Sequence, residues 1–86
     1  MDYKEINLKL DRLVDAINHE IDGKCYAYMS RFNCEWYYHL SIDFEFSNLH
    51  VNISISEETM IATQLEVLTH QCMNGIKAEI ISNYFK

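Results

Sequence analysis

Apolar residues recur every three or four positions in the first quarter of the chain. Between residues 3 and 22 they form one stripe of a helix, and the intervening positions are polar or charged. The stripe consists of Ile6, Leu10, Leu13, Val14, Ile17 and Ile21. Asp2 is suited to cap the first turn, and Gly23 is suited to the left-handed position that ends a helix. The pattern therefore predicts an amphipathic helix over residues 3–22.

The period of the pattern changes to two after residue 23. Residues 24–32, 35–46 and 49–56 alternate between apolar and polar side chains, which predicts strands with one buried and one wetter face. Short turns at 33–34 and 47–48 join them, so we expect an antiparallel meander. The inward positions are Cys25, Ala27, Met29, Trp36, Tyr38, Leu40, Ile42, Phe44, Phe46, Leu49, Val51, Ile53 and Ile55.

Helical spacing returns after the third predicted strand. Ser56 is a suitable N-cap, and two glutamates follow it in the first turn, where the helix dipole favours anions. An apolar stripe then predicts a helix over residues 57–73. The Asn74–Gly75 pair predicts a stop, with a short extra helix over 76–85. A single kinked helix over 57–85 is the alternative.

This order of elements predicts one α+β domain over residues 1–86. The apolar face of the sheet needs a cover, and two amphipathic helices supply one. We expect an α-β-β-β-α two-layer sandwich, in which a three-stranded antiparallel meander is covered on one face and open on the other. The chain has no Pro and only 2 Gly, so a linker between domains is not expected.

Charge narrows the classes of partner. The formal net charge is −6, from 7 Lys and Arg against 13 Asp and Glu, and no Lys or Arg occurs in residues 32–76. Direct binding to nucleic acid or to an anionic membrane surface needs a basic footprint, so neither is expected. An acidic surface can bind a protein with a basic surface, or it can simply keep the chain soluble. Both interpretations remain open at this point.

The apolar runs, the N-terminal sequence and the cysteines indicate the cellular compartment. No apolar run approaches the roughly 18 residues that cross a bilayer, and the N-terminus lacks the pattern of a secretory signal. The three cysteines, Cys25, Cys34 and Cys72, are odd in number and widely spaced. We therefore expect reduced thiols, one or two of them in the core, and a cytoplasmic protein.

A search for chemistry finds no catalytic motif, so we expect a protein that is not an enzyme and needs no cofactor. His39 and His50 can face each other on neighbouring strands, with Asp43 nearby, which suggests a metal site. The set has no well-spaced third ligand, so no metal is expected. The preferred interpretation is a group of polar residues on the solvated face of the sheet.

The outward face of the second predicted strand is the best candidate for partner binding. It combines tyrosine with acids, and two further glutamates follow the third strand and should flank one end of the sheet. The predicted partner-binding residues are Glu35, Tyr37, His39, Asp43, Glu45, Glu57 and Glu58. Asp43 and Glu45 should lie roughly 7 Å apart on a strand, a spacing similar to that of neighbouring phosphates.

The order of elements resembles that of double-stranded RNA-binding domains. Those domains bind through lysines at the start of the last helix and through a loop between the first two strands that contains Gly and Pro. The corresponding helix start here, Ser56-Glu57-Glu58-Thr59, is acidic. The corresponding loop, Arg31-Phe32-Asn33-Cys34-Glu35, has neither Gly nor Pro. RNA binding is therefore not expected.

In size and composition the chain resembles small acidic phage-encoded inhibitors of host defence, the anti-CRISPR and anti-restriction proteins. This group shares no fold or motif, so no residue is aligned. The resemblance implies an inhibitor in the host cytoplasm that blocks a basic site on a nucleic-acid-processing enzyme. The alternative is a homo-oligomer, such as a homodimer, with a structural or adaptor role. It rests on the open sheet face and the apolar segment from Ile80 to Phe85.

Overall fold

The computed structural model describes residues 2–45 and 47–84, apart from the side chain of Tyr84. Its three strands pair antiparallel in the order β1-β2-β3, which confirms the predicted α+β class and the meander. The elements in chain order are α1 (Tyr3–Glu20), β1 (Gly23–Phe32), β2 (Glu35–Phe44), β3 (His50–Ser56), α2 (Glu57–Ala62) and α3 (Leu65–Tyr84).

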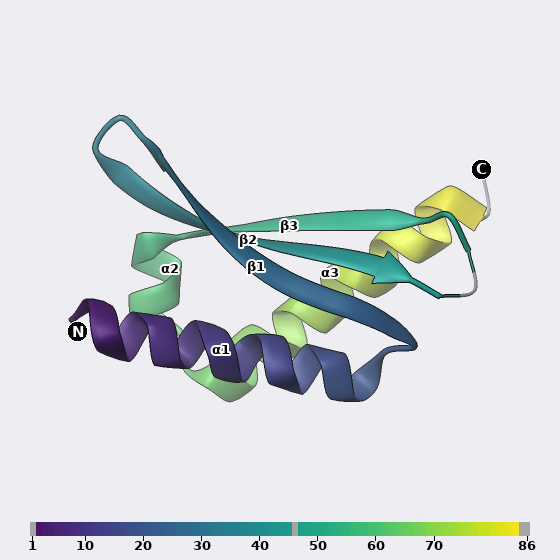
Figure 1. The fold of residues 1–86 in the computed structure, drawn as a ribbon, viewed down its shortest axis with the longest axis horizontal. Helices are drawn as coiled ribbons and strands as arrows, with labels where there is room; N and C mark the ends of the chain where they lie inside the picture. Colours follow the sequence, from purple (N-terminus) through teal and green to yellow (C-terminus); the bar gives the residue numbers. More distant parts are fainter. Residues whose placement is uncertain (1, 46, 85–86) are drawn as a thin grey trace.

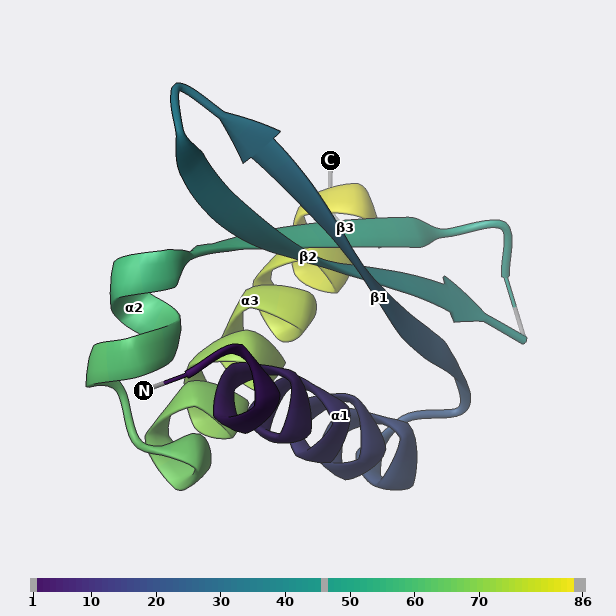
Figure 2. The same ribbon diagram turned by 60° about the vertical axis from the view of Figure 1, so that its left-hand side comes forward.

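The sheet and the helices form two layers. All three helices lie on one side of the twisted sheet, and the other face of the sheet is uncovered (Figures 1 and 2). Apolar side chains from α1, the inward face of the sheet, α2 and α3 form the core between the layers. Tyr38, Leu40 and Ile42 of the central strand β2 are completely buried there, as the alternation predicts.

The start of α1 agrees with the sequence, but its end does not. The Asp2 carboxylate accepts a hydrogen bond from the Glu5 amide at 2.9 Å, so Asp2 caps the helix as predicted. Gly23 was expected in the left-handed conformation, but no glycine has a positive φ and Gly23 begins β1. A Cβ at this position would lie 2.3 Å from the Asp43 carbonyl oxygen. Close approach of two backbones therefore explains the glycine.

The break between the last two helices lies earlier than predicted. Ser56 caps α2 by accepting from the Thr59 amide, but α2 ends at Ala62, and α3 runs without interruption through Asn74 and Gly75. The apolar stripe of α3 continues past the glycine into the core, and this packing outweighs the local stop signal. The Lys9 ammonium of α1 fixes the actual break by donating to the Met60 and Thr63 carbonyls.

The hairpin of β1 and β2 extends past the helices, as the upper left of Figure 1 shows. Its turn is tight, as predicted, with φ angles of 49° at Asn33 and 63° at Cys34. Because no helix covers this end, Met29 is 47% exposed although its position faces the helix side. The Arg31 guanidinium lies over the Trp36 ring, 5.6 Å from its centre. Phe46, predicted to face inward, lies outside the described residues.

Candidate partner-binding site

Polar side chains on the open sheet face bond to one another across the strands. His39 lies at the centre of one group, with Ser30 Oγ 2.6 Å from its Nε2 atom and Ser54 Oγ 2.9 Å from its Nδ1 atom. The Tyr28 ring stacks on the same imidazole, with ring centres 4.7 Å apart. His39, a predicted partner-binding residue, is therefore already engaged within the sheet and is half-buried.

A second group of hydrogen-bonded side chains lies nearer the C-terminal end of β2. His50 contacts Ser41 Oγ through Nε2 at 3.0 Å and the Asp43 carboxylate through Nδ1. This order of serine, histidine and aspartate resembles that of a nucleophile with its base and orienting acid. However, Ser41 is only 3% exposed, although the alternation placed it on the wetter face. A substrate would not reach its hydroxyl, so the geometry favours a structural role.

The two histidines do not form the facing pair that the sequence suggested. The strand register pairs His39 with Ser54 and His50 with Asp43. Among the described residues, no group of three or more His, Cys, Asp or Glu side chains is arranged to hold a metal ion. The polar partners of these histidines are therefore hydroxyl and carboxylate groups within the sheet.

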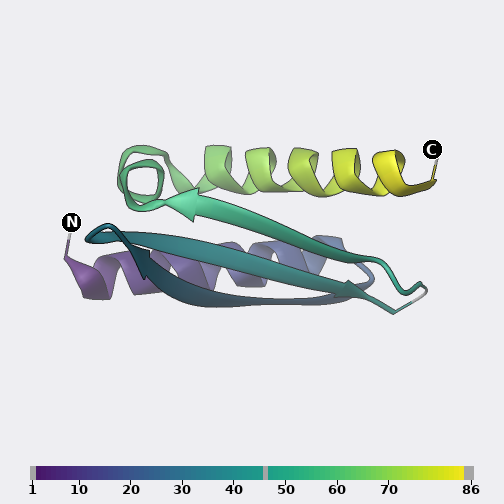
Figure 3. The same ribbon diagram turned by 90° about the horizontal axis from the view of Figure 1, so that it is seen from above.

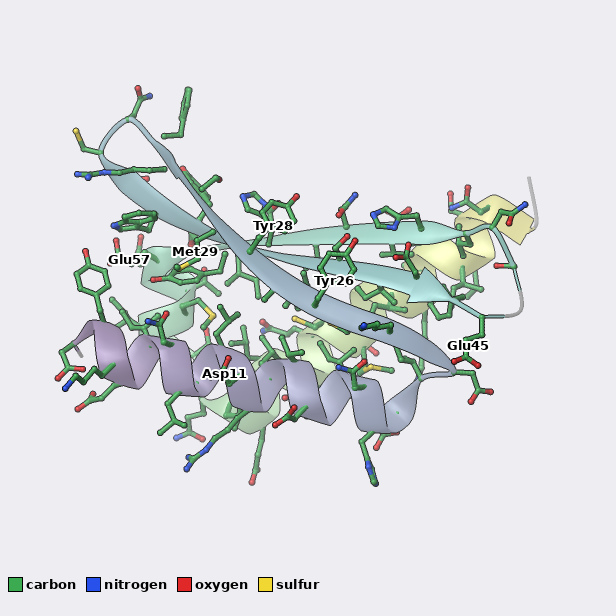
Figure 4. All side chains as sticks on the ribbon, in the orientation of Figure 1. Asp11, Tyr26, Tyr28, Met29, Glu45 and Glu57 are labelled. Atoms are coloured by element: carbon green, nitrogen blue, oxygen red, sulfur yellow. The ribbon has the colours of Figure 1, made fainter. Side chains whose placement is uncertain are left out.

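Glu45 lies at the end of the sheet opposite Glu57 (Figure 4), and Asp43 precedes it by two residues, near the end of β2. The regular strand ends at Phe44, so the two-residue strand spacing behind the phosphate comparison does not extend to Glu45. The Glu45 amide donates to the Asp22 carbonyl at 3.2 Å. From Glu35 to Asp43 the strand covers about 26 Å, at the usual rise per residue. The predicted surface is thus divided between two ends of the sheet.

Three of the predicted acids meet at the end of the sheet where β2 begins and β3 ends. Glu35 from the start of β2 and Glu57 and Glu58 from the start of α2 line one hollow of about 280 Å³. Ser56 and Ile61 complete its lining. Residues far apart in the sequence come together here because β3 returns the chain to the start of β2 and α2 follows directly. We call this feature the acidic hollow.

Tyr37 links the acidic hollow to the sheet face. Its hydroxyl donates to a Glu35 carboxylate oxygen at 3.2 Å. This hydrogen bond to the carboxylate raises the pKa of Tyr37, and the negative charge of Glu35 raises it further. The tyrosine therefore remains a neutral donor that orients Glu35. Four of the seven predicted residues, Glu35, Tyr37, Glu57 and Glu58, are grouped at this end.

An apolar groove adjoins the acidic hollow, and the sequence did not reveal it. It occupies about 410 Å³ between β3 and α3, which run side by side in Figure 3. Apolar side chains in its lining are Tyr37, Ile53, Ile55, Leu68 and Cys72. Ser56 lines both the groove and the acidic hollow, and Tyr37 of the groove is hydrogen-bonded to Glu35 of the hollow. Periodicity placed Ile53 and Leu68 on inward faces, but only the packing of the two elements could show a gap between them.

The cysteines lie where composition suggested. Cys25 and Cys72 are buried and Cys34 is exposed, and all three are free thiols. Burial raises the pKa of Cys25 to about 11, and the neighbouring Cys72 contributes to this increase. Burial also raises the pKa of Cys72 to about 11. Both buried thiols are therefore held in the neutral, unreactive form at neutral pH.

In the part of the chain that the structure describes, no helix combines the length and apolar character needed to span a membrane. Searches against protein-family models, curated proteins and solved structures find no significant match to this chain.

Proposed function

We propose that this protein binds a basic segment of another protein at the acidic hollow and the adjoining apolar groove, and that it acts by occupying that partner's site. The observation that carries the proposal is the convergence of Glu35, Glu57 and Glu58 around one hollow. Among the described residues none of these three carboxylates forms an ion pair with Lys or Arg, and no Lys or Arg occurs in residues 32–76. The role is non-catalytic and requires no cofactor.

The hollow suits a cationic side chain. Carboxylates from two elements can accept several hydrogen bonds from one guanidinium group, and bonds between charged groups are among the strongest in proteins. Encounter with a basic partner is accelerated by the net charge of −6 and should weaken as salt increases. Glu57 and Glu58 also stabilise the start of α2 without any partner. Only a binding measurement separates these two roles.

The apolar groove supplies the other part of the proposed contact with the partner. Interfaces owe most of their affinity to a few apolar or aromatic anchors in a pocket, while charged residues around them guide association. A partner segment with a basic residue followed by an apolar residue fits the hollow and the groove together. Tyr37, which lines the groove and bonds to Glu35, belongs to one of the residue types enriched among such anchors.

The class of partner follows from the charge. Basic grooves that attract carboxylates are typical of proteins that bind or process nucleic acids. We propose that this protein competes with nucleic acid for such a groove in the cytoplasm. This mode of action is similar to that of phage-encoded anti-CRISPR and anti-restriction inhibitors. The second candidate, a homo-oligomeric adaptor without an inhibitory role, is favoured by the uncovered sheet face.

The test begins with capture of partners from the source cell by the tagged full chain and their identification by mass spectrometry. The Glu57→Lys/Glu58→Lys double variant and Tyr37→Ala should each lower the affinity for the captured partner at least about tenfold, the usual effect of losing an anchor. Glu66→Lys/Glu79→Lys is the matched control, because it makes the same charge change at exposed positions of α3. Circular dichroism should show an intact fold in all variants, and the melting temperature of Glu57→Lys/Glu58→Lys should fall only slightly, because the two glutamates stabilise the start of α2.

Two outcomes would count against the proposal. If the α3 control weakens binding as much as the hollow variant, the contact is a general charge effect. If added nucleic acid does not displace the protein from its partner, occupation of a nucleic-acid site is wrong. Asp43→Lys/Glu45→Lys tests the far end of the sheet separately. Unchanged affinity in that variant would reject the spacing comparison with phosphates and leave the acidic hollow as the site.

A further inference from the structure

β1 is an edge strand whose outer side is only partly satisfied. It pairs with β2 alone, so its other side faces away from the sheet. Near its beginning, the Asn18 amide of α1 takes the place of a neighbouring strand. Asn18 Nδ2 donates to the Cys25 carbonyl at 2.9 Å, and the Cys25 amide donates to Asn18 Oδ1 at 2.7 Å. Asn18 therefore ends the ladder at Cys25.

At the next two residues whose backbone groups point away from β2, no described side chain bonds to the strand as Asn18 does at Cys25. In an antiparallel ladder the N–H and C=O groups of one residue point to the same side, and the side alternates along the strand. Since those of Cys25 point away from β2, those of Ala27 and Met29 do so as well. Within residues 2–45 and 47–84 no hydrogen bond reaches either of them. The edge thus presents free donors and acceptors in register.

Apolar side chains are concentrated at the same place. Tyr28 is 49% exposed and Met29 is 47% exposed, and Tyr26 lies beside them on β1 (Figure 4). A hollow of about 520 Å³ separates this part of β1 from α1. Its lining includes Leu10, Asp11 and residues 25–29. An exposed edge strand with apolar side chains is a site for strand pairing.

We infer that the occupant of this edge is a second copy of the chain, with the two β1 strands antiparallel about a two-fold axis at Tyr28. In this register Ala27 faces Met29 of the second copy, and Met29 faces its Ala27. The free N–H and C=O groups then satisfy one another, as a closed symmetric contact requires. The axis places Tyr28 opposite its own copy, next to the stacked His39.

Side chains on both faces fit this register. The exposed Met29 of each copy lies over the small Ala27 of the other, at the hollow beside α1. The charged residues leave this register free of opposed acids. Arg31 lies opposite Cys25 of the second copy, at the end of a hollow lined by Asp11, and β1 itself carries no acid. No carboxylate of this strand therefore opposes another across the contact.

This inference does not depend on the proposed function. The β1 edge lies at the opposite side of the sheet from the groove beside β3, so pairing leaves both copies of the acidic hollow accessible. The two sheets would join into one continuous sheet. The outcome is a symmetric dimer that presents two partner-binding sites.

The first test is the mass in solution, measured by sedimentation equilibrium from about 1 μM to about 1 mM, the range of weak to moderate affinities. We expect a reversible increase from the monomer mass of 10.2 kDa toward twice that value. Met29→Glu should weaken association at least about tenfold, because it places a charge at the edge beside Asp11. Val67→Glu is the matched control, since Val67 on α3 is also 47% exposed. Met29→Leu should retain dimerisation.

The second test fixes the register by cysteine cross-linking in the Cys34→Ser background. Tyr28→Cys should form a disulfide between copies under mild oxidation, because opposed residues of this kind have Cβ atoms about 5 Å apart. Tyr26→Cys should not, since its two copies would be separated by four residues of strand, about 14 Å. A monomer at all concentrations, equal cross-linking at both positions, or loss of the dimer in Val67→Glu but not in Met29→Glu would each overturn the inference.

Discussion

Single side chains of β2 show what alternation predicts and what it leaves out. The alternation correctly assigned Tyr38 and Ile42 to the core, because one face of a half-buried strand must be apolar. It could not foresee that Ser41, on the outer face, would be covered and bonded to His50. Hydrogen bonds across strands depend on the register, and the register depends on turns and packing. Individual polar contacts therefore could not be predicted from the sequence.

The Tyr38 hydroxyl is buried and has no hydrogen-bond partner among the described residues. We expect Tyr38→Phe to leave the free energy of unfolding unchanged or to raise it by up to about 2 kcal/mol, because the unmet hydrogen bond is removed while the ring is kept. Urea denaturation measures this change. Tyr38→Ala is the comparison, with an expected loss of about 3–5 kcal/mol for the ring. A loss above about 1 kcal/mol in Tyr38→Phe would mean that the hydroxyl makes a favourable contact.

The buried thiols make stability depend on alkaline pH. Cys25 and Cys72 have pKa values raised from 9.0 to about 11 in the folded protein. Unfolding therefore lets both thiols release protons above pH 9, and the free energy of unfolding should fall as the pH rises from 9 to about 11. Cys25→Ala should reduce this fall relative to Cys34→Ala, a change at an exposed thiol. Equal pH dependence in both variants would contradict the assignment.

Whole elements were predicted better than their junctions. All three strands and the first helix were expected within a few residues of where they lie, because long periodic patterns reflect burial. The last helices were divided at the wrong place. Asn74 and Gly75 form a local stop signal, but Cys72 and Ile76 on either side are buried in the core. Tertiary packing outweighed propensity there, and a single sequence does not contain that information directly.

Gly75 offers a direct check on the continuous α3. We expect Gly75→Ala to raise the free energy of unfolding by about 0.5–1 kcal/mol, since alanine favours the interior of a helix. Space is sufficient, because the added Cβ would lie 3.6 Å from Ile53 Cδ1, an ordinary contact. Thermal and urea unfolding would reveal the change. A destabilised variant would indicate that the helix ends near this residue, as the sequence suggested.

Lys9 is the link that ends α2. Its ammonium is partly buried and donates to the Met60 and Thr63 carbonyls. We expect Lys9→Met to lower the free energy of unfolding by about 1–3 kcal/mol, because these carbonyls lose a charged donor. Lys4→Met, at an exposed position of the same helix, should have little effect. Equal losses in the two variants would argue against the role of Lys9.

At the scale of the whole molecule, the sequence predicted the class of fold and the acidity of one region, but not the site itself. The alternation placed Glu35 on the open face, and Ser56 predicted where α2 begins. That Glu35, Glu57 and Glu58 would share one hollow depends on the twist of the sheet and the angle of α2. The groove beside α3 depends on the same arrangement. The pattern of apolar residues contains neither the twist of the sheet nor the angle of α2.

The most direct measurement of the central claim is an NMR titration of the 15N-labelled full chain with a peptide of consecutive arginines. The account predicts that amide shifts concentrate at Glu35, Tyr37, Glu57 and Glu58, and that they largely disappear when NaCl rises from about 0.05 M to about 0.5 M. The Glu57→Lys/Glu58→Lys variant should lose these shifts, and Glu66→Lys/Glu79→Lys should retain them. Shifts spread over all acidic residues, or centred on α1 or on Asp43 and Glu45, would contradict the account.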